Sequence, residues 1–202
     1  AYVGTYTHGT SKGIQVYDVN LEEGTLTERS EVEVSNASYT AVSKNGKYLY
    51  SIEDEGVAVF KRDHNGDLAR INSVDIDGMR GCFLATDVDG KYLYVAGYHD
   101  GKVTVVHTHK DGRLGSVMDL VDIVRCPRES GPRIIRFSAD GRFAYVLFEL
   151  SNEIKVYSYD GSGDVPEFEL LQSISTLAKK EDGGVSHNAA SGLALAPDGR
   201  HL

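Results

Sequence analysis

The chain has 202 residues, a hydrophobic content of 41% and a formal net charge of −9. This length and composition suit one packed all-β domain, and the negative charge argues against nucleic acids and anionic membranes as partners. No run of about 18 apolar residues is present and no signal peptide is visible, so we expect a cytoplasmic protein without a membrane-spanning helix.

The N-terminal segment predicts three strands, and a repeated phrase then runs through the rest of the chain. The glycines of this phrase are separated by steps of 44, 51 and 58 residues. A period of about 40 to 50 residues built from short strands is typical of a β-propeller blade. The copies are Asn45-Gly-Lys-Tyr-Leu-Tyr50, Asp89-Gly-Lys-Tyr-Leu-Tyr94, Asp140-Gly-Arg-Phe-Ala-Tyr145 and a shorter Asp198-Gly-Arg-His-Leu202.

One repeat shows the four strands of a blade clearly. Apolar residues at 82–88 lead into the turn Asp89-Gly90, and strands follow at 91–98, 103–109 and 114–121. These strands are apolar on both faces, as expected for a sheet packed between two neighbours. The same pattern predicts blades at 39–76, 82–121 and 133–176.

The two ends of the chain predict one shared blade. Residues 2–7, 14–19 and 26–34 supply three strands without an innermost strand, and Gly192–Pro197 predicts the missing one. We therefore expect residues 193–196 to pair with residues 2–7, directly or across a subunit boundary. The prediction is a single domain over 1–202, in which 2–35 plus 191–202 form the closing blade. The competing interpretation is a trimmed seven-bladed protein.

Pairs of equivalent positions in the repeats identify a candidate site. In a propeller, the start of each innermost strand and the end of the next strand ring one mouth of the central channel. These positions lie seven residues before and nine residues after the start of the repeated phrase. One repeat alone places an arginine and a glutamate there. The pairs are Arg133 with Glu149, Cys82 with Tyr98, Ser38 with Asp54, and Ser191 with Tyr6.

An arginine beside a carboxylate suits hydrolytic chemistry. Arg133 would bind an anionic group or stabilise an oxyanion, and Glu149 would act as a general base. The alternative is a structural ion pair. Further substrate-binding candidates are Arg136, Asp54, Tyr98 and His187.

The remaining polar residues carry weaker signals. The cysteines, Cys82 and Cys126, are too few for a disulfide framework and lack metal-ligand spacing, so we expect reduced thiols. His107 and His109 lack a nearby third ligand, and neither a metal nor a cofactor is expected. The segment 175–191 predicts a solvated loop, or alternatively a lid over the channel.

Several segments resemble the lactonase-type propellers, which are the 6-phosphogluconolactonase-like proteins related to carboxy-muconate lactonizing enzyme. The similar segments are Tyr2-Val-Gly-Thr-Tyr-Thr7, Ser130-Gly-Pro-Arg133, Glu149-Leu-Ser151 and Gln172-Ser-Ile-Ser-Thr-Leu177. The resemblance implies a seven-bladed fold and hydrolysis of a sugar-acid lactone. It also implies that the family's site arginine and glutamate fall on Arg133 and Glu149.

The chain departs from the family pattern in several places. A His-bearing blade expected between Met118 and Leu120 is absent, and Ile134 stands where a histidine usually follows the Gly-Pro-Arg bend. The leading hypothesis is a lactonase acting on a small anionic sugar lactone such as 6-phosphogluconolactone. The alternative is a non-catalytic propeller that serves as a scaffold or binding module. Self-association that completes the ring is a further expectation.

Overall fold

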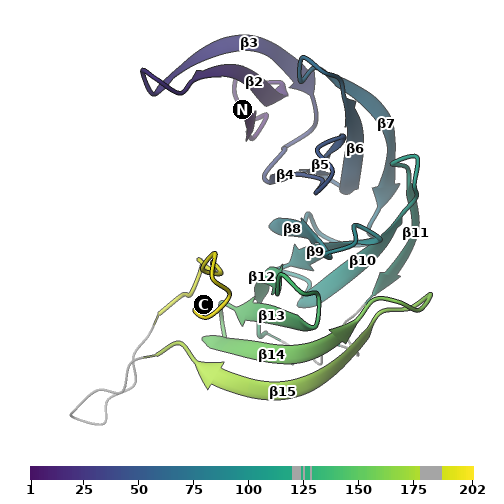
Figure 1. The fold of residues 1–202 in the computed structure, drawn as a ribbon, viewed down its shortest axis with the longest axis vertical. Coiled ribbons are helices and arrows are strands. Elements are labelled where there is room, and N and C mark those ends of the chain that lie inside the picture. Colours follow the sequence, from purple (N-terminus) through teal and green to yellow (C-terminus); the bar gives the residue numbers. More distant parts are fainter. Residues whose placement is uncertain (120–123, 125, 128, 178–187) are drawn as a thin grey trace.

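The computed structural model describes residues 1–119, 124, 126–127, 129–177 and 188–202. Its strands form antiparallel sheets that stand side by side around an open arc (Figure 1). None of the helices among these residues is long and apolar enough to cross a membrane. The strands are β1 (Tyr2–Gly4), β2 (Gly13–Asn20), β3 (Thr25–Glu33), β4 (Thr40–Val42), β5 (Tyr48–Glu53), β6 (Gly56–Arg62), β7 (Leu68–Asp75), β8 (Phe83–Thr86), β9 (Tyr92–Gly97), β10 (Lys102–Thr108), β11 (Leu114–Asp119), β12 (Pro132–Phe137), β13 (Phe143–Phe148), β14 (Glu153–Asp160) and β15 (Glu167–Ser175).

Each sheet is a propeller blade whose strands follow one another in chain order. The first sheet has the order β1-β2-β3, and the next three are β4-β5-β6-β7, β8-β9-β10-β11 and β12-β13-β14-β15. The inner strands β4, β8 and β12 face the centre of the arc, and β7, β11 and β15 lie on its outer rim (Figure 1). The all-β propeller fold predicted from the repeat is therefore confirmed.

Alternating side chains on each strand build the contacts between neighbouring sheets. On β5, Leu49 belongs to the core shared with the first sheet, whereas Tyr50 and Ile52 belong to the core shared with the third. Successive residues of a strand point to opposite faces, so a strand buried on both sides must be apolar throughout. The repeated Tyr-Leu-Tyr phrase meets this requirement.

The glycine of the repeated phrase is required by its turn. Its φ angle lies between 68° and 71° in all four copies, in the left-handed region that glycine adopts without steric cost. The residue before it stabilises the same turn, since Oδ1 of Asp140 accepts a hydrogen bond of 3.1 Å from the amide of Arg142. The glycines are Gly46, Gly90, Gly141 and Gly199.

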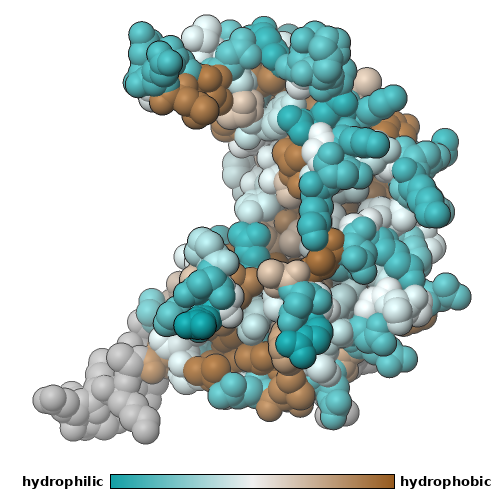
Figure 2. Space-filling view, viewed as in Figure 1, coloured by the Kyte–Doolittle hydropathy of each residue, from teal (hydrophilic) through white to brown (hydrophobic). Residues whose placement is uncertain are grey.

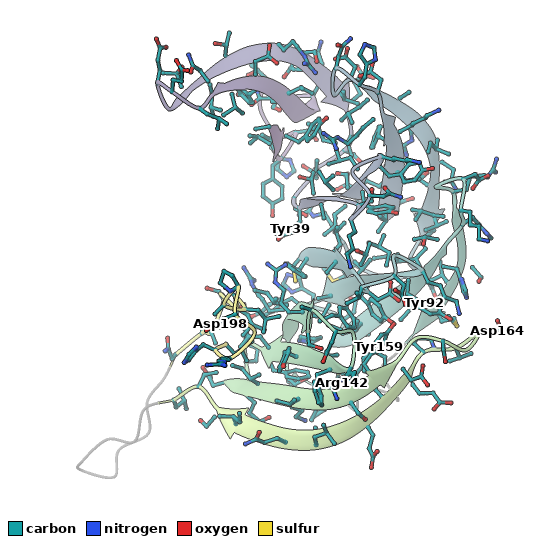
Figure 3. All side chains as sticks on the ribbon, in the orientation of Figure 1. Tyr39, Tyr92, Arg142, Tyr159, Asp164 and Asp198 are labelled. Carbon is teal, nitrogen blue, oxygen red and sulfur yellow. The ribbon has the colours of Figure 1, made fainter. Side chains whose placement is uncertain are left out.

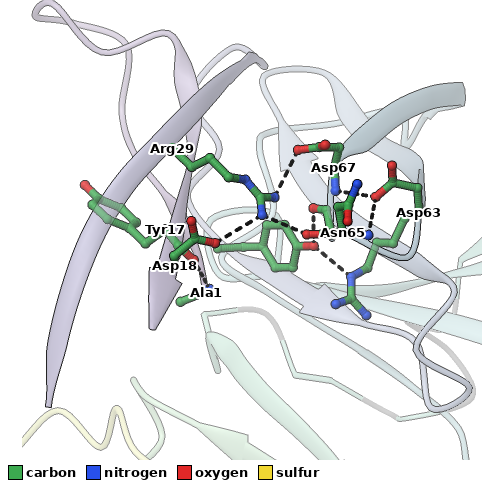
Figure 4. A network of polar contacts seen from close by, with 10 residues as sticks. Ala1, Tyr17, Asp18, Arg29, Asp63, Asn65 and Asp67 are labelled. Atoms are coloured by element: carbon green, nitrogen blue, oxygen red, sulfur yellow. Dashed lines mark hydrogen bonds and ion pairs between the residues drawn. The ribbon is translucent and has the colours of Figure 1, made fainter. Parts of the chain in front are cut away.

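A polar network fastens the first sheet to the second (Figure 4). Arg29 on β3 donates through Nη1 to Oδ1 of Asp18 at 3.1 Å and to the carbonyl oxygen of Asn65 at 2.7 Å. Its Nη2 atom donates to Oδ1 of Asp67 at 3.0 Å. One guanidinium thus joins two strands of the first sheet to the turn between β6 and β7.

The expected closure between the two chain ends is wrong for this single chain. Residues 192–197 form no strand, and none of the described backbone hydrogen bonds joins 193–196 to 2–7. Instead, the carbonyl oxygen of Leu193 accepts a hydrogen bond of 3.5 Å from Nε of Arg136 on β12. The sheets follow a gentle curve that leaves a wide opening between the first sheet and the C-terminal segment (Figures 1 and 2).

Candidate active site

A pocket of 570 Å³ lies among the inner strands, where β8 and β12 begin. Tyr39, which also lines it, lies at the inner edge of the arc (Figure 3). Two positions from the repeat pairs, Asp54 and Glu149, are not among the lining residues. Six of the eight positions do line it: Tyr6, Ser38, Cys82, Tyr98, Arg133 and Ser191.

Arg133 and Glu149 form an ion pair at the wall of this pocket. Nη1 of Arg133 lies 2.9 Å from Oε2 of Glu149, and the side chains are 38% and 15% exposed. Local backbone geometry sets up the pair. Gly131 has a φ of 63°, and its carbonyl oxygen accepts a hydrogen bond of 2.9 Å from the amide of Glu149. The pairing of β12 with β13 then shifts register between Pro132 and Ile134. This bulge turns Arg133 toward the pocket.

Buried oxygen atoms without partners occur in the segments that carry Glu149. Within the described part of the chain, Oε2 of Glu149 accepts no well-aligned hydrogen bond, despite its closeness to Arg133. Oγ of Ser130 and Oδ1 of Asn152 are also buried without a partner. The backbone holds these residues close together, because the carbonyl oxygen of Ser130 accepts the amides of Leu150 and Ser151. An unsatisfied buried polar group costs about 1 to 3 kcal/mol and requires an explanation, of which a catalytic role is one.

Arg136 presents a second cationic group to the pocket. Its guanidinium lies 4.8 Å from the ring centre of Phe83, and its Nε atom donates to the carbonyl oxygen of Leu193. Among the described residues, no carboxylate pairs with it. The positive charge of Arg136 is therefore available to an anionic ligand.

Arg80 is a third arginine in the pocket, and the sequence comparison of repeats missed it. Its Nη1 atom lies 3.0 Å from Oδ1 of Asp54, and its guanidinium lies 4.9 Å from the ring centre of Tyr6. Asn36 donates to the same oxygen of Asp54 at 2.7 Å. The hydrogen bond from Asn36 and the contact with Arg80 lower the pKa of Asp54. Asp54, predicted to bind substrate, thus holds Arg80 in place instead of lining the pocket.

Tyr98 and His99 form another part of the wall. Tyr98 lies under Arg133, with 5.9 Å between the guanidinium carbon and the ring centre. His99 also lines the pocket, and the comparison of repeats did not identify it. One sequence signal could have identified His99. It directly follows Tyr98, which is a counted position at the end of the second strand of its blade. His187 lies outside the described residues.

Cys82 is a poor nucleophile despite its place in the pocket. Burial raises the pKa of its thiol, and Sγ lies 3.3 Å from the carbonyl oxygen of Ala96 as a donor. A protonated thiol neither attacks a carbonyl nor binds metal efficiently. Cys82 and Cys126 are both free cysteines.

Comparisons with known proteins point to one family. The family described as "Lactonase, 7-bladed beta-propeller" matches residues 1–124 and 119–202. The 6-phosphogluconolactonase of Bacillus subtilis is 28% identical over all of this chain and 72% of its own length. That of Formosa agariphila is 24% identical over all of this chain and 73% of its own length.

Solved structures show the same fold. A proposed 6-phosphogluconolactonase from Bacteroides uniformis superposes with a TM-score of 0.79 at 24% identity, covering 98% of this chain and 58% of that one. The periplasmic gluconolactonase of Pseudomonas aeruginosa gives a TM-score of 0.66 at 25% identity, covering 98% of this chain and 73% of that one. The chain thus spans less than three quarters of each relative.

Part of this difference in length lies inside the matched span. The alignment with the Bacillus protein extends over 258 residues, whereas this chain has 202. The two segments matched by the family meet at residues 119–124. That junction adjoins the place where the resemblance predicts a His-bearing blade that the sequence lacks.

Proposed function

Because the chain belongs to the lactonase family of seven-bladed β-propellers, we propose that it hydrolyses a sugar-acid lactone such as 6-phosphogluconolactone. The observation that carries the proposal is the ion pair of Arg133 with Glu149 at the wall of a pocket lined by three arginines. The relatives named 6-phosphogluconolactonase support the same class of substrate.

Arg133 is suited to stabilise the charge that develops during lactone hydrolysis. Attack of water on the lactone carbonyl places a negative charge on the carbonyl oxygen, and collapse of this intermediate breaks the ring C–O bond. A guanidinium has five N–H donors, and the ion pair with Glu149 joins Nη1 of Arg133. No described residue accepts a hydrogen bond from its other donors, so they can bind the oxyanion.

A general base must accept the proton of the attacking water and return it to the alkoxide that leaves. Glu149 is the first candidate, since its carboxylate already lies beside Arg133. The carboxylate of Glu149 reaches the substrate only if the side chain of Arg133 moves toward the lactone and so exposes Glu149. His99 is the second candidate, because it lines the pocket directly and imidazole suits proton transfer near neutral pH.

The proposal is tested by measuring lactone hydrolysis above the spontaneous rate. We expect R133A to lower kcat/KM by about 100-fold or more, and loss of the true base to lower kcat by about 100-fold. E149Q and H99Q decide between the two bases. R142A is the matched control, since Arg142 is 74% exposed and pairs with Asp140 on a distant turn. A wild-type chain that adds nothing to the spontaneous rate across sugar lactones contradicts the proposal.

A binding module without catalytic activity is the second candidate function. It is favoured by the apolar residues Phe83 and Ile134 in the pocket and by the place of Glu149 behind Arg133. This alternative predicts that 6-phosphogluconate, the hydrolysis product, raises the melting temperature of wild type but not of R133A. Turnover would remain at the spontaneous rate in both proteins.

A further inference from the structure

A second pocket, of 720 Å³, lies at the opposite end of the strands from the candidate active site. Tyr48 and Tyr50, which line it, stand at the start of β5, whereas Asp54 beyond the end of β5 is held beside the first pocket. The turns of the second and third sheets form its remaining walls, over residues 43–45, 89–91 and 107–110. The two pockets share no lining residue.

The second pocket is positively charged although the chain is acidic. Its lining contains three lysines, Lys44, Lys91 and Lys110, against one carboxylate, Asp89. Lys91 is held by the carbonyl oxygens of Gly161 and Ser162 at 3.2 and 3.1 Å, which do not cancel its charge. In a chain with a net charge of −9, such a local excess attracts small anions.

Tyr50 lines this pocket, and its hydroxyl lacks a protein partner among the described residues. Tyr50 is only 3% exposed, and no residue that the structure describes forms a hydrogen bond with its hydroxyl. By contrast, Tyr92 on the next sheet donates to the carbonyl oxygen of Gly163 at 2.6 Å. Burial raises the pKa of Tyr50 to about 12, so the O–H group remains a donor at neutral pH. An acceptor on a ligand would satisfy it.

Two glycines make room for aromatic rings in the wall of this pocket. A Cβ atom on Gly112, whose φ is 88°, would overlap the ring of Tyr48. A Cβ atom on Gly115 would lie 2.5 Å from Nε2 of His109. Both rings line the pocket, so glycine at these positions opens space for flat ring surfaces. Such surfaces favour a planar group on the ligand.

We propose that this pocket binds a small aromatic anion. Its anionic oxygens lie beside Lys44 and Lys110, its ring lies against Tyr48 and His109, and one of its oxygens accepts the hydroxyl of Tyr50. The site is independent of lactone hydrolysis, because none of these residues lines the first pocket.

Isothermal titration calorimetry on the whole chain, with phenyl phosphate as the probe, tests this site. Phenyl phosphate should bind more tightly than either inorganic phosphate or phenol, because only it offers both charge and ring. The double variant K44Q/K110Q should weaken binding about tenfold or more. Y50F, which removes one hydrogen bond, should weaken it about fivefold. K12Q is the charge control, since Lys12 lies outside the pocket and is 61% exposed.

R133A separates this site from the first pocket. Phenyl phosphate should bind R133A as tightly as wild type if it occupies the second pocket. Loss of binding in R133A, equal affinity of K44Q/K110Q and wild type, or absence of measurable binding would each overturn the proposal. Thermal unfolding of every variant shows whether it remains folded. Y50F removes only the hydroxyl group, so this variant conserves both the packing of the ring and the charge of the pocket.

Discussion

The hydroxyl of Tyr159 donates a hydrogen bond of 3.0 Å to Oδ2 of Asp87, which joins β14 of the fourth sheet to the end of β8 in the third (Figure 3 labels Tyr159). Oδ1 of the same carboxyl group accepts the amides of Lys91 and Tyr92 at 2.9 and 3.2 Å. The hydroxyl of Tyr94 lies 2.9 Å from that of Tyr159. A buried acid is thus part of the contact between two blades.

This arrangement predicts a specific pH dependence of stability. Burial raises the pKa of Asp87 above its ordinary value of 3.8, so the folded chain holds this proton more tightly than the unfolded chain. The resulting stabilisation is fully present below 3.8 and is lost as the pH rises through the folded pKa. In urea unfolding, wild type should therefore gain stability relative to D87N as the pH falls from neutral toward 3.8. Parallel pH profiles for the two proteins would contradict this.

Two glycine substitutions separate backbone strain from steric overlap. Gly24 and Gly112 have φ angles of 68° and 88°, which both lie in the left-handed region. A Cβ atom on Gly24 would meet nothing within 4 Å, whereas a Cβ atom on Gly112 would overlap the ring of Tyr48. G24A should lower the free energy of unfolding by about 1 to 2 kcal/mol through strain alone. G112A should lower it by about 3 kcal/mol, because a ring must also move. Equal losses in denaturant unfolding would show that Tyr48 does not need this space.

The arginines of the first pocket should differ in their effect on stability. R133L leaves Oε2 of Glu149 buried without its cation, so we expect a loss of about 1 to 2 kcal/mol. The double variant R133L/E149L should recover much of this loss. R136L should change stability by less than about 0.5 kcal/mol, since Arg136 has no described carboxylate partner and leucine retains contact with Phe83. Equilibrium unfolding in urea measures all three, and a neutral R133L would contradict the role of the ion pair.

The repeat made the blades predictable, but it did not predict the conformation of the C-terminal segment. Each internal copy of the repeated phrase lies beside strands that its own blade supplies, so local pattern and tertiary partner agree. Residues 192–197 have the same apolar pattern and their turn forms, since the amide of Gly199 donates to the carbonyl oxygen of Ala196. They remain without strand pairing, because the other strands of a blade do not follow them in the described chain.

From the sequence, the candidate site was predictable only at positions that lie at a fixed number of residues from the repeated phrase. Counting from the turn phrase brings Arg133 and Glu149 together, and the ion pair is present. It does not reveal that Glu149 lies behind Arg133, which depends on how the bulge in β12 directs the side chains. Arg80 and His99 lie in loops just outside the counted positions, two residues before Cys82 and one residue after Tyr98. Only the three-dimensional arrangement places them in the pocket.

The inner edge of the first sheet predicts how isolated chains associate. β1 pairs with β2 on one side only, and the inner strand expected beside it does not form within the chain. Val3 on this strand is 40% exposed. An unpaired strand edge with an exposed apolar side chain favours pairing with another chain, and a charge on such a strand suppresses it. We therefore expect concentration-dependent association of wild type in sedimentation velocity, and less association of V3K.

A lysine on another strand tests whether association depends on this edge and not on apolar exposure in general. Val42 on β4 is 44% exposed, but β4 forms the inner strand of a complete four-stranded sheet. V42K adds the same charge and removes a similar apolar surface, so it should associate as wild type does. If wild type stays monomeric over the accessible concentrations, or if V42K suppresses association as strongly as V3K, pairing at β1 is not what joins the chains. Selective loss in V3K would instead show that the missing inner strand is supplied by a neighbouring molecule.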